Sequence, residues 1–203
     1  HHLLGDCLSR DGRAEEAEEH YQKGIDRELS NVGIRNDYAK FLLAQNRPSD
    51  AIELLHNFLE EHGPDERLWA LGCQIVNGHL GEIDVANDWT ECALLHYPEN
   101  PEIRKHRAIA LLTAGQFTEA VKYFEETPEL ANDVTTAAIY LCRIVSGQTA
   151  KLKIPENELV ISKYLADWYR RLLVHENEEA TQKVLTRLED VERVLPTAGR
   201  VLR

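Results

Sequence analysis

Long apolar runs are missing from this sequence of 203 residues. No uninterrupted apolar stretch approaches the ~18 residues that a membrane-spanning helix needs, so we expect a soluble protein. Methionine is absent too, even from the first position, which is His1. Because the first predicted helix also begins part-way through its pattern, we expect the natural N-terminus to lie outside this sequence. The lack of a signal peptide then carries no information, and a cytoplasmic location is the remaining expectation.

Cysteine and positive charge are both scarce. The four cysteines, Cys7, Cys73, Cys92 and Cys142, lie far apart and form neither a CxxC pair nor the close spacing of a disulfide framework. We expect them to be reduced and buried as small apolar side chains. The net charge is −12, and the 23 Lys and Arg residues are not gathered in one segment. Such a chain would repel a phosphate backbone, so we expect no nucleic-acid binding.

What the sequence does contain is a block of small and apolar residues that recurs four times. One ladder of small residues, at steps of 34, 33 and 36, consists of Gly5, Ala39, Gly72 and Ala108. A second ladder, at steps of 34, 35 and 34, consists of Ala17, Ala51, Ala86 and Ala120. Two antiparallel helices approach closely only where a small residue stands at their contact, so each ladder marks one helix of a pair. The shared period predicts an all-α array of stacked helix pairs.

The turns between paired helices carry their own signals. Gly12, Asn46 and Gly115 stand where a first helix must end in a left-handed turn, which glycine and asparagine tolerate best. In the third copy the two small residues lie 14 apart, whereas they lie 12 apart in the others. We therefore expect two extra residues in the third turn, within Asn77–Gly81.

The repeated block has a period of 34 residues and contains Leu-Gly, an aromatic residue or leucine, alanine and proline at fixed offsets. This pattern resembles the tetratricopeptide repeat (TPR) family. The resemblance implies a right-handed superhelical solenoid of antiparallel helix pairs over residues 1–147. Its repeats are expected at 1–30, 31–63, 64–98 and 99–131, with a degenerate fifth at 132–147. A linker at 148–157 then leads to an amphipathic helical pair at 158–203, which predicts a C-terminal cap. The second helix of this pair is expected to run from about Glu178 to Leu195 and to stop at Pro196.

The resemblance also implies a function, that of a non-catalytic scaffold or adaptor that binds another protein. First helices of such arrays line a concave groove, in which we expect an apolar or amphipathic partner segment. The implied groove residues are Asn36, Lys40, Leu43, Trp69, Cys73, Val76, Asn77, Lys105, Ile109, Leu112, Ile139 and Arg143. Two other readings of this apolar strip stay open: the C-terminal helices could fold back over it, or the twist of the array could bury it.

Some members of the family bind chaperone tails by gripping a terminal carboxylate with lysine and asparagine. Here acidic residues, among them Asp37 and Glu66, occupy the corresponding places and would repel such a tail. Acidic runs elsewhere could attract a basic partner, although a solvated helix face is the plainer interpretation. The sequence therefore argues against a carboxylate clamp.

No arrangement of residues predicts an enzyme, a cofactor or a metal. Cys92 and His96 share one helical face at ligand spacing, but two ligands are too few, and a packing role is favoured. Asn77–Gly81 lacks the Lys-Ser/Thr of a phosphate loop. Two alternative functions stay open. The chain could be a regulatory or targeting module of a larger enzyme, or a scaffold that self-assembles when the first repeat of one copy docks on the C-terminal pair of another.

Overall fold

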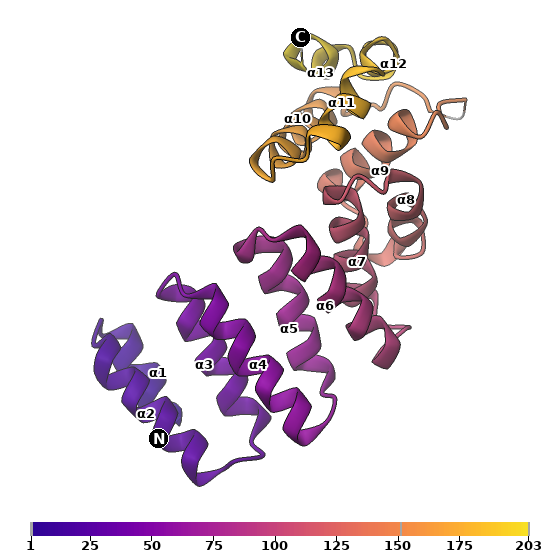
Figure 1. Ribbon diagram of the computed structural model, residues 1–203. Coiled ribbons are helices and arrows are strands. Elements are labelled where there is room, and N and C mark those ends of the chain that lie inside the picture. The colour runs from indigo at the N-terminus through magenta and orange to yellow at the C-terminus, as the bar shows by residue number, and fades with distance from the viewer. Residues whose placement is uncertain (1, 151, 203) are drawn as a thin grey trace. The chain divides into compact units, whose positions relative to one another are not determined.

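The computed structural model describes residues 2–150 and 152–202, and the regular structure within them is entirely helical, with 13 α-helices (Figure 1). The all-α prediction is therefore confirmed. The chain divides into two compact units, His1–Gly81 and Glu82–Arg203.

The first unit contains two antiparallel helix pairs and the first helix of a third. Its helices are α1 (His2–Arg10), α2 (Ala14–Arg27), α3 (Val32–Ala44), α4 (Pro48–His62) and α5 (Glu66–Ile75). The pairs α1–α2 and α3–α4 pack within themselves, and α3 also contacts α2 and α5. A Cβ atom on Gly5 would lie 3.1 Å from the ring of Tyr21. Glycine at this rung of the first ladder thus allows the close approach of α1 and α2, as predicted.

The turn residues adopt the left-handed conformation that the sequence predicted. Gly12, Asn46 and Gly115 all have positive φ angles, of 77°, 59° and 79°. The predicted insertion in the third repeat forms a π-helix, η1 (Val76–Leu80), which continues α5 and ends at the left-handed Gly81. A wider helical turn, rather than a longer loop, therefore absorbs the extra residues.

The second unit begins with α6 (Ile83–His96), the fourth helix pair and a fifth first helix. These are α7 (Pro101–Thr113), α8 (Phe117–Glu125), the 3₁₀ turn η2 (Pro128–Leu130) and α9 (Asp133–Val145). After a loop come α10 (Glu158–Val174), α11 (Glu178–Leu185), α12 (Leu188–Val194) and α13 (Pro196–Leu202).

The prediction of a single second helix after residue 177 is wrong, because three short helices occupy this segment. The helical stretch does stop before Pro196, as predicted, because α12 ends at Val194. Pro196 then begins α13, where a missing N–H at the first position is harmless. The Glu158 carboxylate of α10 accepts hydrogen bonds from the backbone N–H and the hydroxyl of Thr197, at 2.9 Å each. The start of α13 is therefore fixed by a residue 39 positions earlier in the chain.

The C-terminal helices and the fourth repeat share one hydrophobic core, which extends from Ala108 to Ala198. The Asn177 side chain at the start of α11 donates a 2.7 Å hydrogen bond to the Thr113 carbonyl at the end of α7. A Cβ atom on Gly115 would lie 3.0 Å from the Ala180 Cβ atom. The first turn of α11 therefore sits directly on the turn between α7 and α8.

The expectation of four buried cysteines is half right. Cys73 and Cys142 are buried, and burial raises the pKa of the Cys73 thiol to about 12. Cys7 and Cys92 are exposed, so the packing role expected for Cys92 is wrong.

Candidate functional site

The predicted groove residues fall into two classes of exposure. Side chains that the protein itself buries are Trp69, Cys73, Val76, Asn77 and Leu112. Those that retain solvent contact are Asn36, Lys40, Leu43, Lys105, Ile109, Ile139 and Arg143. The first class packs the fold, and only the second offers surface to a partner.

In the first unit the exposed members all lie on α3. Lys40 is exposed, whereas Asn36 and Leu43 are half-buried. Lys40 borders a hollow of about 290 Å³ between α1 and α3, together with Ser9, Arg10, Tyr21, Asp37, Phe41 and Ala44. Among the residues that the structure describes, no acidic side chain forms an ion pair with Lys40. We call this area the α1–α3 hollow.

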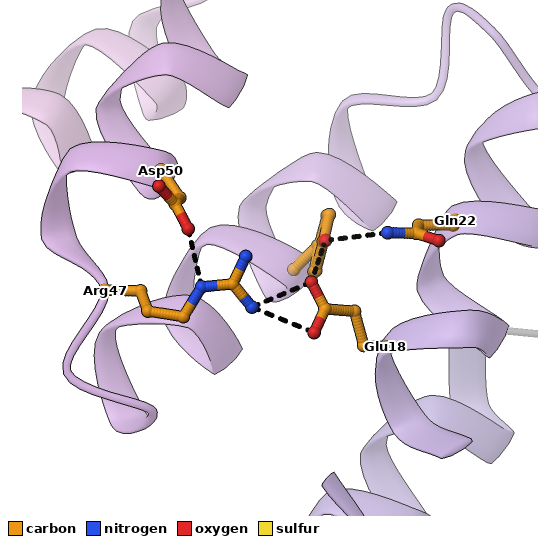
Figure 2. A network of polar contacts seen from close by, with 5 residues as sticks. Glu18, Gln22, Arg47 and Asp50 are labelled. Carbon is orange, nitrogen blue, oxygen red and sulfur yellow. Dashed lines mark hydrogen bonds and ion pairs between the residues drawn. The ribbon is translucent and has the colours of Figure 1, made fainter. Parts of the chain in front are cut away.

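A polar network links α2, α3 and the start of α4 (Figure 2). Arg47, before α4, donates to both carboxylate oxygens of Glu18 on α2 at 2.8 Å, and its Nε donates to Asp50. The Tyr38 hydroxyl on α3 donates to Glu18 at 2.8 Å and accepts from Gln22 at 3.4 Å. Burial, followed by the bond to the Glu18 carboxylate, raises the pKa of Tyr38 to about 12. Three helices are thereby tied through one carboxylate.

In the second unit the predicted groove residues lie on α7 and α9, and their charges already have partners. Lys105 lies 3.5 Å from Glu102, and Arg143 donates to Glu125. Leu112 belongs to the core cluster that also contains Ile161, Leu165 and Leu172 of α10, and Ile109 and Ile139 pack against that cluster. The C-terminal helices therefore contribute to the core that encloses this part of the apolar strip, as one of the open readings allowed.

His106 on α7 has a strongly perturbed pKa. Burial, followed by the positive charge of Lys105, lowers its pKa to about 4, and Arg171 of α10 acts in the same direction. A histidine with so low a pKa is neutral near pH 7. It is therefore a packing residue at neutral pH.

A different hollow, of about 600 Å³, lies among α6, α7 and α8. We call it the α6–α8 groove. Its apolar lining consists of Leu94, Leu95, Pro98, Leu111 and Tyr123, and its charged lining of Glu91, Arg104, Arg107, Glu119, Lys122 and Glu126. The sequence analysis did not predict this groove. The consecutive leucines Leu94 and Leu95 near the end of α6 were a possible signal, because α6 buries Ala93 and therefore leaves Leu95 78% exposed.

Across residues 2–150 and 152–202, no three His, Cys, Asp or Glu side chains converge as a metal site would require. In the same residues no helix has the length and apolar character to cross a bilayer.

Comparison with known proteins decides the family. Two models described as tetratricopeptide repeat match residues 8–74 and 85–134, which together make up more than half of the chain. The chain is a TPR protein. Both ladders of small residues fall largely within these matches, so the family predicted from the residues is confirmed. No curated protein matches the sequence significantly.

Solved structures resemble this TPR protein in fold. A MamA structure has a TM-score of 0.60 at 17% identity, covering 87% of this chain and 96% of its own. YrrB, described as a TPR protein with an unusual peptide-binding site, has a TM-score of 0.59 at 17% identity. The match covers 91% of this chain and 98% of the YrrB chain. PilF of Pseudomonas aeruginosa has a TM-score of 0.59 at 14% identity, and the match covers 98% of this chain and 93% of the PilF chain. At these identities the likeness establishes the helical solenoid fold and nothing further.

Proposed function

We propose that this TPR protein is a non-catalytic adaptor that holds a segment of another protein on the first helices of its N-terminal repeats. The observation that carries the proposal is the α1–α3 hollow, which is bordered by Lys40. The Lys40 ammonium group forms no ion pair with any residue whose side chain the structure describes. The name given to YrrB, a protein of the same fold, supports peptide binding as the kind of activity.

The exposure of the predicted groove residues narrows the proposed surface. Trp69, Val76 and Leu112 are buried and would have to leave the core to touch a ligand. Asn36, Lys40 and Leu43 lie at intervals of three and four residues along α3, so they share one face of the helix. Leu43 would supply apolar contact, and Lys40 would set the register of the bound segment.

The hollow offers both kinds of contact that a peptide site needs. The exposed Ala44 gives the hollow an apolar edge above the buried rings of Tyr21 and Phe41, and Ser9 and Lys40 give it donors. A volume of about 290 Å³ is at the lower end of ligand sites, which suits one anchoring side chain of an extended segment and not a drug-sized molecule.

A phage-displayed library of random 12-residue peptides tests the proposal with the whole chain as bait. Peptides that it selects are then synthesised and their affinities measured by fluorescence anisotropy. For ligands that contact both the exposed face of α3 and the α1–α3 hollow, we expect Leu43→Asp and Lys40→Glu to weaken binding at least tenfold. Val174→Asp changes an exposed apolar residue of α10 and is the matched control, with an expected change below twofold. If every selected peptide binds both α3 variants as tightly as the unmodified protein, the proposed surface is wrong.

A further inference from the structure

A hollow of about 660 Å³ lies at the turn between α10 and α11. We call it the α10–α11 hollow, and its lining consists of Leu173, Glu176, Asn177, Glu178, Thr181 and Gln182. Two of these side chains are carboxylates, and none is a cation. The charged lining of the α6–α8 groove, by contrast, holds three acids and three cations. The α10–α11 hollow therefore presents charge of one sign.

Both carboxylates of the hollow are open to a partner. Glu176 and Glu178 are exposed, and no residue whose side chain the structure describes forms an ion pair with either. The next acid along α11 differs, because the Glu179 carboxylate lies 2.7 Å from the Lys183 ammonium group. α10 ends at this turn, so the negative end of its dipole adds to the two carboxylates. The positive end of α11 is capped by the side chain of Asn177, and the balance favours a cationic ligand.

The backbone at Glu176 is of a kind that glutamate seldom adopts. Its φ angle is 52°, in the left-handed region, where glutamate is held at a cost in energy. It is the second residue after the end of α10. The turns after α1, α3, α7 and α9 have, at the same place, Gly12, Asn46, Gly115 and Gly147. This turn thus places a carboxylate at the edge of the hollow where glycine would be less strained, and such strain often accompanies binding sites.

An apolar side chain lies beside the two acids. Leu173, in the last turn of α10, lines the hollow and is 50% exposed. The adjacent Val174 is 78% exposed, which extends the apolar surface outside the hollow. A volume of about 660 Å³ is in the middle of the range of ligand sites and accommodates a long side chain with its neighbours. Acidic and apolar groups together match a segment in which lysine or arginine stands next to an apolar residue.

We propose that the α10–α11 hollow is a second docking surface, for a partner segment in which lysine or arginine flanks an apolar residue. The cationic side chains pair with Glu176 and Glu178, and the apolar side chain packs on Leu173. This hollow belongs to the second unit, whereas the α1–α3 hollow belongs to the first. The proposal therefore stands or falls independently of the one made for α3.

Titration of the ¹⁵N-labelled full chain, followed by nuclear magnetic resonance, tests the proposal. The probe is a ten-residue peptide with Arg-Leu-Arg at its centre, flanked by glycine and serine. In one control peptide glutamate replaces both arginines, and in the other serine replaces the leucine. We expect the probe to shift the amide signals of Leu173, Glu176 and Thr181 with submillimolar affinity. The serine control should bind at least fivefold more weakly, and the glutamate control should leave these signals unchanged.

Other occupants of the hollow give different results in the same titration. Spermidine carries positive charge without an apolar side chain, so affinity equal to that of the probe would assign the hollow to small cations. The same shifts on concentrating the free protein would assign it to a second copy of this chain. Either result, or shifts confined to other residues, overturns the proposal.

Variants separate a binding role from a structural one. Glu176→Gln and Glu178→Gln should each weaken the probe at least fivefold. Glu53→Gln, at an exposed position of α4, makes the same change in net charge elsewhere and should have less than a twofold effect. Leu43→Asp should also leave the probe unaffected, which separates this surface from the α1–α3 hollow. Unchanged binding with Glu176→Gln, or an equal loss with Glu53→Gln, contradicts the proposal.

Glu176→Gly gives a readout that a purely structural role would not produce. Glycine relieves the left-handed strain, so the urea midpoint of unfolding should rise. Because the carboxylate is lost, binding of the probe should fall at least fivefold in the same variant. A more stable protein that binds the probe as tightly as before would show that the carboxylate has no part in docking, and the proposal would be wrong.

Discussion

The contact between α11 and the α7–α8 turn gives the sharpest stability prediction. Gly115 has a φ angle of 79°, so alanine there would be held in the left-handed conformation at a cost of about 1–2 kcal/mol. Its new methyl group would also lie 3.0 Å from the Ala180 Cβ atom and 3.6 Å from the Ala180 Cα atom. Overpacking of this kind costs about 1–3 kcal/mol. For Gly115→Ala we therefore expect a total destabilisation of about 2–5 kcal/mol.

Gly12 provides a matched control at the equivalent turn of the first repeat. Its φ angle is 77°, but an added Cβ atom would have nothing within 4 Å. Gly12→Ala should therefore cost only the conformational strain of about 1–2 kcal/mol. The difference between the two substitutions measures how tightly α11 is docked.

A double-mutant cycle with Ala180→Gly isolates the contact itself. Alone, Ala180→Gly should cost about 1 kcal/mol, because glycine weakens α11. In the Gly115→Ala background it removes the colliding methyl group, so the two changes should be coupled by about 1–3 kcal/mol. Urea titration followed by circular dichroism gives the total effect, and amide hydrogen exchange in α7 and α11 assigns it to the second unit. If Gly115→Ala costs no more than Gly12→Ala and the cycle shows no coupling, the docking of α11 on this turn is refuted.

Three further outcomes follow from burial. A thiol reagent should modify Cys7 and Cys92 rapidly in the native protein and the other two cysteines only after denaturation, as absorbance titration would show. The pKa of Tyr38 is raised to about 12, so its share of the unfolding free energy should be complete below pH 10 and decline as the pH rises towards 12. Spectrophotometric titration should show that Glu18→Gln lowers this pKa. The pKa of His106 is lowered to about 4, so the unfolding free energy should fall as the pH drops from about 6.5 to about 4, and urea titrations of His106→Gln should show a smaller fall.

The repeat architecture could be predicted because its signal is local and recurs. Gly5 faces Tyr21 across one helix pair, and the same spacing returns in the next three copies. Each copy therefore repeats the evidence of the one before. The left-handed turns at Gly12, Asn46 and Gly115 were predictable for the same reason, since the residue type alone favours that conformation.

Features that depend on distant contacts could not be predicted in this way. The apolar pattern runs without glycine or proline from Glu178 to Leu195, yet the helix breaks near Arg187, whose guanidinium lies beside Gly147. Leu112 was expected in the groove because the family resemblance implies that its position on a first helix faces the concave side. The resemblance cannot show that α10 to α13 will contribute to the core enclosing that face.

The core that joins the fourth repeat to the C-terminal helices has a consequence for the order of unfolding. In the first unit the packed helices are near neighbours along the chain, so its helix pairs can open one at a time. In the second unit, bonds such as the one from Asn177 to Thr113 close a loop of 64 residues, so loss of one helix weakens several others. We expect the N-terminal pairs to fray first and the second unit to unfold later as a block. A ligand held on α3 would then slow the earliest step of unfolding, and a ligand held in the α10–α11 hollow would leave that step unchanged.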